Sequence, residues 1–178
     1  MTTTNHNMQD TNNYWEQLER LEKLIRASEL KAGILFSFHS LILGIFVDRI
    51  GVLESAFTNS TLFVAFATLW IIAVLISIYY CFKCFQPNLE LKYDTNVFFF
   101  SDAAHKFDNV QTFTKEITTI CMSNDEIVAK LSEQIHAESI IIDKKFYNVK
   151  KAIQFFVLSF VFLVIMMAVW VFEVVFLK

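Results

Sequence analysis

The sequence predicts an all-α integral membrane protein with three transmembrane helices and a cytosolic helical bundle formed by extensions of the membrane helices. Residues 32–47, 61–85 and 152–177 are apolar, and each stretch approaches the roughly 20 residues that a helix needs to cross a bilayer. Of the 178 residues, 55% are hydrophobic, which is more apolar surface than one soluble core of this size can bury. With only 3 glycines and 1 proline, and without the alternation of a barrel strand, these stretches are expected to be helices.

Lysine and arginine residues are unevenly distributed along the chain, and this asymmetry predicts the orientation of the spans. Four basic residues lie shortly before the first span, only Arg49 lies in the segment that follows it, and nine lysines occur between residues 83 and 151. Because segments rich in basic residues stay in the cytoplasm, the N-terminus and residues 86–151 are predicted to be cytoplasmic. The C-terminus is then predicted to lie outside.

The N-terminal part of the chain is predicted to contain one helix that runs from the cytosol into the membrane. Residues 1–13 are a polar tract and are expected to form a disordered tail. From Tyr14 to His39 apolar and small residues recur at three- and four-residue steps, which predicts a cytosolic helix continuing into transmembrane helix 1 over residues 14–53. Residues 54–60 are expected to form an external loop, with Asn59 or Ser60 capping transmembrane helix 2 at residues 61–85.

The rest of the chain is predicted to return to the cytosol and then cross the membrane again. Residues 86–122 are expected to form short cytosolic helices, with Pro87 as a stop after the second span. The segment 123–126 fits a capping box and predicts a long cytosolic helix, residues 123–151, that continues into transmembrane helix 3 at residues 152–177. Two uninterrupted helices would pass a change in bundle packing to the spans, which suggests a signal-coupled membrane protein.

The sequence contains no motif of a hydrolase or transferase, and we expect the protein not to be an enzyme. Gly-rich phosphate loops, G-x-S-x-G elbows and H-E-x-x-H zinc motifs are all missing. Cys81 and Cys84 have C-x-x-C spacing, but they lie at the end of a span with no second cysteine pair nearby. They are better interpreted as small buried apolar residues, and no metal or cofactor is expected.

Two ionisable residues fall on apolar faces. His39 lies inside the first span, where it either lines a conductive path or hydrogen-bonds a neighbouring span; its candidate partners are Ser37, Ser40 and Ser77. Glu138 lies on the apolar stripe of the last long helix. It either pairs with a cation from the first helix or lies at the edge of a slightly rotated stripe; the candidate cations are Arg20, Arg26 and Lys31.

A nucleotide site would need cations for the phosphate, an aromatic or aliphatic platform for the base and an amide for its edge. Residues of these types occur in the predicted cytosolic bundle. On this chemistry alone the candidate ligand-binding residues are Trp15, Arg20, Arg26, Phe100, Lys106, Asn109 and Gln134.

Residues 26–44 resemble the first-span pattern of the small transmembrane effectors of Pycsar antiphage defence. The pattern is a small-acidic-x-Lys-Ala-small run, here Ser28 to Gly33, that leads into a span with a polar-small pair and a later glycine, Gly44. His39-Ser40 stands where an Asn-Gly pair is commoner in the family. Residues 98–104, and residues 134–139 with Lys144, are similar to later blocks, so the resemblance covers most of the chain beyond the tail.

The resemblance implies that a pyrimidine nucleotide cyclase makes cyclic CMP or cyclic UMP on infection. The effector would sense this ligand in the cytosol and disrupt the bacterial inner membrane, so that the infected cell stops growing or dies. The implied partners are the lipid bilayer, the cyclic pyrimidine mononucleotide and further copies of the chain, and no nucleic acid is expected. The alternatives are a membrane scaffold or partner subunit without a nucleotide ligand, and a small channel.

Overall fold

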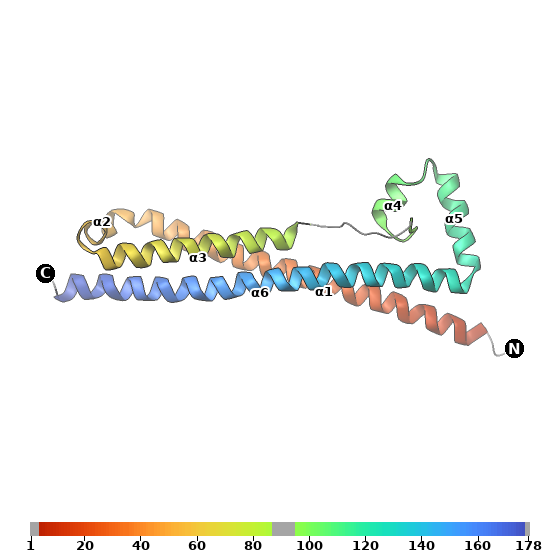
Figure 1. The fold of residues 1–178 in the computed structure, drawn as a ribbon, viewed down its shortest axis with the longest axis horizontal. Coiled ribbons are helices and arrows are strands. Elements are labelled where there is room, and N and C mark those ends of the chain that lie inside the picture. Colours follow the sequence, from red (N-terminus) through yellow and green to blue (C-terminus); the bar gives the residue numbers. More distant parts are fainter. Residues whose placement is uncertain (1–3, 87–94, 177–178) are drawn as a thin grey trace. The chain divides into compact units, whose positions relative to one another are not determined.

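The computed structural model of the protein describes residues 4–86 and 95–176 (Figure 1). The secondary structure of these residues consists of helices and turns without a strand, which confirms the all-α class. The helices are α1 (Thr4–Asp48), α2 (Ile50–Asn59), α3 (Thr61–Phe85), α4 (Phe100–His105), α5 (Val110–Met122) and α6 (Asn124–Phe176).

The beginning and end of α1 differ from the prediction. The helix begins at Thr4, although residues 1–13 were expected to be a disordered tail. Residues 4–13 contain neither glycine nor proline, so no residue in them stops a helix from extending backwards from Tyr14. At the other end α1 stops at Asp48 rather than continuing to residue 53, and Arg49 connects it to α2.

The predicted external loop at residues 54–60 is wrong, because residues 54–59 are the second half of α2. The physical reason is packing. Leu53 and Ala56 of α2 are buried in one apolar cluster with Phe63 and Ala67 of α3 and Met166 of α6. A helix places Leu53 and Ala56 on the same face, whereas an irregular loop would not bury both.

The starts of α3 and α6 agree with the expected caps. The Ser60 hydroxyl accepts a hydrogen bond from the Phe63 N–H at 3.2 Å, and the Ser123 hydroxyl accepts one from the Glu126 N–H at 3.4 Å. Each bond satisfies an N–H that has no partner inside its helix. The expected stop at Pro87 lies outside the described residues.

The chain divides into two compact units. The first unit contains Met1–Arg26 and Pro87–Asp143, and the second unit contains Ala27–Gln86 and Lys144–Lys178. Helices α1 and α6 each contribute residues to both units. Within each helix the structure has no break, α1 being continuous through Lys31 and α6 through Lys151.

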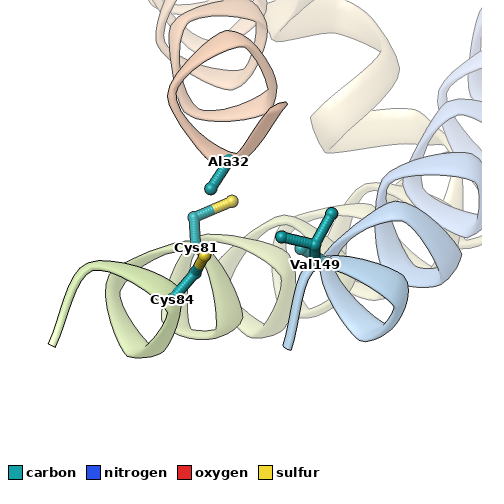
Figure 2. Packing of buried hydrophobic residues seen from close by; sticks show 5 residues of the cluster. Ala32, Cys81, Cys84 and Val149 are labelled. Atoms are coloured by element: carbon teal, nitrogen blue, oxygen red, sulfur yellow. The ribbon is translucent and has the colours of Figure 1, made fainter. Parts of the chain in front are cut away.

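The second unit contains α2, α3 and parts of α1 and α6. In it, α3 runs beside the C-terminal part of α6 (Figure 1). Figure 2 shows Ala32 of α1, Cys81 and Cys84 of α3 and Val149 of α6 gathered in one cluster of buried side chains. Both cysteines are free and buried, as the interpretation of the C-x-x-C pair as small apolar residues requires.

Of the helices that the structure describes, three are long and apolar enough to cross a membrane, namely α1, α3 and α6. In the most apolar window of α1, and likewise of α6, only 11% of residues are buried inside the protein, against 33% in α3. Large apolar side chains such as Leu41, Leu75 and Val161 therefore point outwards. Water is a poor solvent for such a surface, and lipid is the surrounding that accounts for it.

Candidate functional site

A network of polar side chains in the first unit is centred on Asn96, which is fully buried. The Asn96 backbone N–H donates to Asp102 Oδ2 at 3.0 Å, and its side-chain Nδ2 donates to the Lys130 carbonyl at 2.8 Å and to Glu133 Oε2 at 3.1 Å. Its Oδ1 accepts from the Phe98 N–H at 3.0 Å. A buried asparagine with its polar atoms paired in this way holds the segment before α4 against α6.

Two cations belong to this network. Lys106 Nζ lies 3.1 Å from Asp102 Oδ2, and Lys130 Nζ lies 3.2 Å from Glu133 Oε2. Each lysine thus pairs with a carboxylate that also accepts a hydrogen bond from Asn96. We call Asn96, Asp102, Lys106, Lys130 and Glu133 the Asn96 network. Its two ammonium groups are of the type that binds phosphate oxygens when the carboxylates are exchanged for a stronger anion.

An aromatic pair lies directly beside the network. The ring of Trp15 meets the ring of Phe98 edge-to-face, with centroids 5.5 Å apart, and the Phe98 N–H is bonded to Asn96. Trp15 is 46% exposed, so part of its ring remains available for stacking. A base or ribose of a ligand could therefore rest on Trp15 while its phosphate meets a lysine.

A stripe of polar residues leads from the network along α6. Lys130, Gln134 and Glu138 are four residues apart and share one face of the helix. Gln134 Nε2 donates to Glu138 Oε1 at 3.1 Å. The amide oxygen of Gln134, Oε1, and the second carboxylate oxygen of Glu138, Oε2, are both buried and have no hydrogen-bond partner.

Among the residues that the structure describes, no cation pairs with the carboxyl group of Glu138, contrary to one of the two explanations that the sequence suggested. Its hydrogen-bond partner is Gln134, while Arg26 pairs with Glu22 and Arg20 is exposed. Burial raises the pKa of Glu138, and the nearby Glu22 carboxylate raises it further, while the hydrogen bond from Gln134 lowers it. Glu138 is half-buried, which agrees better with a position at the edge of the apolar stripe.

Three of the seven predicted ligand-binding residues lie in the Asn96 network or next to one of its members. Lys106 belongs to the Asn96 network, Trp15 is joined to it through Phe98, and Gln134 follows Lys130 by one helical turn. The other four are placed apart from these contacts. Arg20 and Arg26 are exposed on α1, Phe100 is 83% exposed at the start of α4, and Asn109 caps α5.

Four residues of the network were missed by the sequence analysis: Asn96, Asp102, Lys130 and Glu133. The bond from Asn96 to Lys130 joins residues 34 positions apart, and no periodic pattern predicts such a pairing. The available signal was local. Asn96 directly precedes an apolar run, and a polar residue next to such a run must find partners when the run is buried.

In the second unit a buried lysine joins three helices. Lys145 of α6 is 6% exposed, and its Nζ donates to Glu29 Oε1 of α1 at 2.8 Å and to the Cys84 carbonyl of α3 at 2.6 Å. The Cys84 carbonyl belongs to the last turn of α3, where carbonyls lack helical partners and a cation is favourable. We call Lys145, Glu29 and the Cys84 carbonyl the Lys145 clamp.

His39 is buried among the apolar helices of the second unit. Its Nε2 has no hydrogen-bond partner, and its ring lies 5.1 Å from that of Phe156. The expected hydrogen bond from His39 to a serine is not formed through Nε2. The candidate serines donate instead to backbone carbonyls. Ser37 and Ser40 bond to carbonyls four residues earlier in their own helix, as short hydroxyls in helices commonly do. Ser77 of α3 donates to the Ala152 carbonyl of α6.

The helical fold with three apolar helices defines a membrane protein. The family model described as Pycsar effector protein domain matches residues 13–172, and the chain therefore belongs to the Pycsar effector family. This confirms the resemblance found in the sequence and identifies an effector of Pycsar antiphage defence. Comparison with curated proteins and with solved structures found no match.

Proposed function

We propose that the protein senses a cyclic pyrimidine mononucleotide, cyclic CMP or cyclic UMP, with its first unit and disrupts the bacterial inner membrane with its second unit. The observation that carries this proposal is the Asn96 network, in which two lysines pair with the carboxylates that Asn96 contacts, together with the aromatic pair of Trp15 and Phe98 beside it. Helix α6 then continues without a break into its apolar half. In this proposal the N-terminus and residues 86–151 face the cytoplasm, and the C-terminus lies outside.

The proposed binding step is an exchange of anions. The cyclic phosphate takes the place of Asp102 at Lys106 and of Glu133 at Lys130, since charge-assisted bonds to phosphate oxygens are strong and an ammonium group accepts either partner. The base stacks on the exposed part of Trp15. No bond of the ligand is broken, and the protein acts as a sensor rather than as an enzyme.

The exchange changes how the first unit packs on α6. Asp102 and Glu133 both accept hydrogen bonds from Asn96, so moving these carboxylates loosens the attachment of the segment before α4. Helices α1 and α6 carry the change into the second unit, where the Lys145 clamp holds them against α3. Opening the clamp lets the apolar helices separate, which disturbs the bilayer.

The energetic demand on the ligand is large. To shift the equilibrium between the resting and the active state from 1:99 to 99:1, the ligand must bind the active state more tightly by about 5.5 kcal/mol. One ionic contact supplies less than this. Assembly of several copies would add the contributions of several ligands, and we propose a homo-oligomer for this reason. The proposed source of the ligand is a pyrimidine nucleotide cyclase that is active during infection.

Calorimetry on the full-length protein in detergent tests the binding step. Cyclic CMP or cyclic UMP should release heat, and Lys130→Ala should weaken the affinity roughly tenfold or more through the lost charge-assisted bond. Lys115→Ala is the matched control, because Lys115 is exposed on α5 of the same unit and should leave binding unchanged. No heat with any cyclic nucleotide would favour a membrane scaffold or partner subunit instead.

A further inference from the structure

We infer that Gln134 and Glu138 read the base of the ligand and select cytosine over uracil. This inference rests on the proposed function, since it concerns the base of the proposed ligand. It is carried by the two buried acceptor oxygens on α6, Gln134 Oε1 and Glu138 Oε2, which have no hydrogen-bond partner.

The two side chains present acceptors because they are already bonded to each other. Gln134 uses its amide Nε2 to donate to Glu138 Oε1, so its Oε1 is directed away from that bond. The carboxylate of Glu138 offers its second oxygen in the same way. A buried oxygen without a donor is unfavourable, and a ligand group with two N–H bonds would satisfy both oxygens at once.

Cytosine carries such a group and uracil does not. The edge of cytosine presents an amino group with two donors, whereas the corresponding atom of uracil is a carbonyl oxygen, an acceptor like the O4 of thymine. Carboxylate side chains accept from the cytosine amino group in many complexes. Uracil in the same position would place its oxygen against two other acceptors, which leaves all three without donors.

The position of the pair agrees with the rest of the proposed site. Gln134 lies one turn from Lys130, the proposed phosphate ligand, and Glu138 lies one turn further along the same face of α6. The Glu22 carboxylate of α1 is close enough to Glu138 to raise the pKa of Glu138. Because the two oxygens are buried, insertion of the base edge would shift α1 relative to α6 within the first unit.

The test is calorimetry on the full-length protein in detergent at pH 7 with cyclic CMP, cyclic UMP and cyclic AMP. The wild-type protein should bind cyclic CMP about tenfold to hundredfold more tightly than cyclic UMP, the range expected for a good two-bond contact to a base edge. In Glu138→Gln the new amide can turn and donate to the uracil carbonyl. The preference for cyclic CMP over cyclic UMP, measured as the ratio of the two affinities, should then fall at least fivefold, mostly because cyclic UMP binds more tightly.

Glu116→Gln is the control, because it makes the same substitution at an exposed position on α5 and should keep the wild-type ratio. Equal or tighter binding of cyclic UMP by the wild-type protein would overturn the inference and leave the proposed function intact. Binding of cyclic AMP as tight as that of cyclic CMP would overturn the choice of cytosine, since adenine also carries an amino group. No binding of any of the three would overturn the proposed function itself.

Discussion

At the residue scale, Lys145 is the buried side chain that links α6 to both α1 and α3 in the second unit. It satisfies a carbonyl at the end of α3 and the Glu29 carboxylate of α1. Glu29 lies in the acidic position of the small-acidic-x-Lys-Ala-small run, so the sequence pattern marked one partner of the clamp. The lysine itself was not distinguishable from its neighbour Lys144, because only three-dimensional packing decides which of two adjacent lysines is buried.

Replacing Lys145 should destabilise the protein. Lys145→Ala leaves the Cys84 carbonyl without its side-chain donor and Glu29 without its cation, and because Glu29 is partly exposed and can be hydrated, we expect a loss of about 2 kcal/mol. For a chain of this length the melting temperature in detergent should fall by roughly 4–8 °C. Lys144→Ala, at an exposed position, serves as the control. Equal melting temperatures for the two variants would show that the clamp does not hold the helices.

Glu138 should make stability depend on pH. Burial raises its pKa in the folded protein above the ordinary value of 4.5. The folded state therefore binds the proton more tightly than the unfolded chain, and the resulting stability is present below pH 4.5 and is lost as the pH rises through the folded-state pKa. Glu138→Gln removes this loss. The variant should thus become more stable relative to wild type as the pH rises from 4.5 to 7.

The size of this effect is limited because Glu138 is only half-buried. Solvent screens the carboxylate, so the free energy of unfolding of Glu138→Gln should rise relative to wild type by at most about 1 kcal/mol over this pH range. Thermal melts of both proteins across this pH range measure it, with Glu116→Gln as a control for the substitution itself. A difference between Glu138→Gln and wild type that stays constant with pH would refute the assignment.

At the element scale, helix ends and helix packing set the limits of what the sequence could predict. The caps at Ser60 and Ser123 followed from local chemistry and were predicted. Helix α2 was not, because its ten residues are stabilised by burial of Leu53 and Ala56 against α3 and α6 rather than by a local signal. The start of α1 at Thr4 was missed for a different reason: a polar composition suggested a tail, but composition alone does not stop a helix.

Asn109, one of the predicted ligand-binding residues, has a structural role at the start of α5. Its side chain accepts from the Thr112 N–H at 2.9 Å and the Thr112 hydroxyl accepts from the Asn109 N–H at 3.3 Å, which forms the capping box of α5. Asn109→Ala should cost about 1 kcal/mol, whereas Asn109→Asp keeps the acceptor and should cost little. Denaturation monitored by circular dichroism compares them.

Binding provides the second readout for Asn109. Since its side chain is occupied by the cap, Asn109→Asp should bind the cyclic nucleotide with wild-type affinity. A large loss of affinity in this stable variant would place Asn109 in the ligand site after all.

The continuity of α6 is the feature of the fold that the proposed mechanism depends on most. Asp143 and Lys144 lie where the helix passes from the first unit to the second, and both are exposed. Replacing both with glycine makes the helix more flexible at this point, because each glycine destabilises a helix by about 1 kcal/mol relative to alanine. We expect ligand affinity to stay unchanged and ligand-dependent membrane damage to fall at least severalfold. The double alanine variant, which keeps the helix rigid, should behave as wild type; equal damage by the two double variants would contradict this coupling.

At the scale of the whole molecule, the sequence predicted the class of the protein better than its site. The three apolar stretches, the scarcity of glycine and proline and the order of the segments sufficed for a helical membrane protein of the Pycsar effector family. The Asn96 network depends on contacts between segments far apart in the chain. Residue type alone suggested Trp15, Lys106 and Gln134 as candidate ligand-binding residues. The residues that they contact could be identified only from the structure.

In the proposed mechanism, the outward-facing apolar surface of α1, α3 and α6 accounts for a chain that is tolerated at rest and damages the membrane when active. Held together by the Lys145 clamp, the helices present apolar side chains to lipid and bury few polar groups there. Separated helices would expose His39, whose Nε2 lacks a partner, and Ser77, whose hydroxyl now donates to the Ala152 carbonyl. Polar groups inside the bilayer attract water, which lowers the barrier to ion leakage.

Dye release from liposomes tests the central claim most directly. The purified wild-type protein is reconstituted with cyclic CMP or cyclic UMP present on both sides of the bilayer, and release is compared with that of the same liposomes without nucleotide. We predict release that requires the nucleotide and that is lost in Lys130→Ala but kept in Lys115→Ala. Release that is equal with and without nucleotide, or no release under conditions where calorimetry shows binding, would contradict the account of a ligand-gated membrane effector.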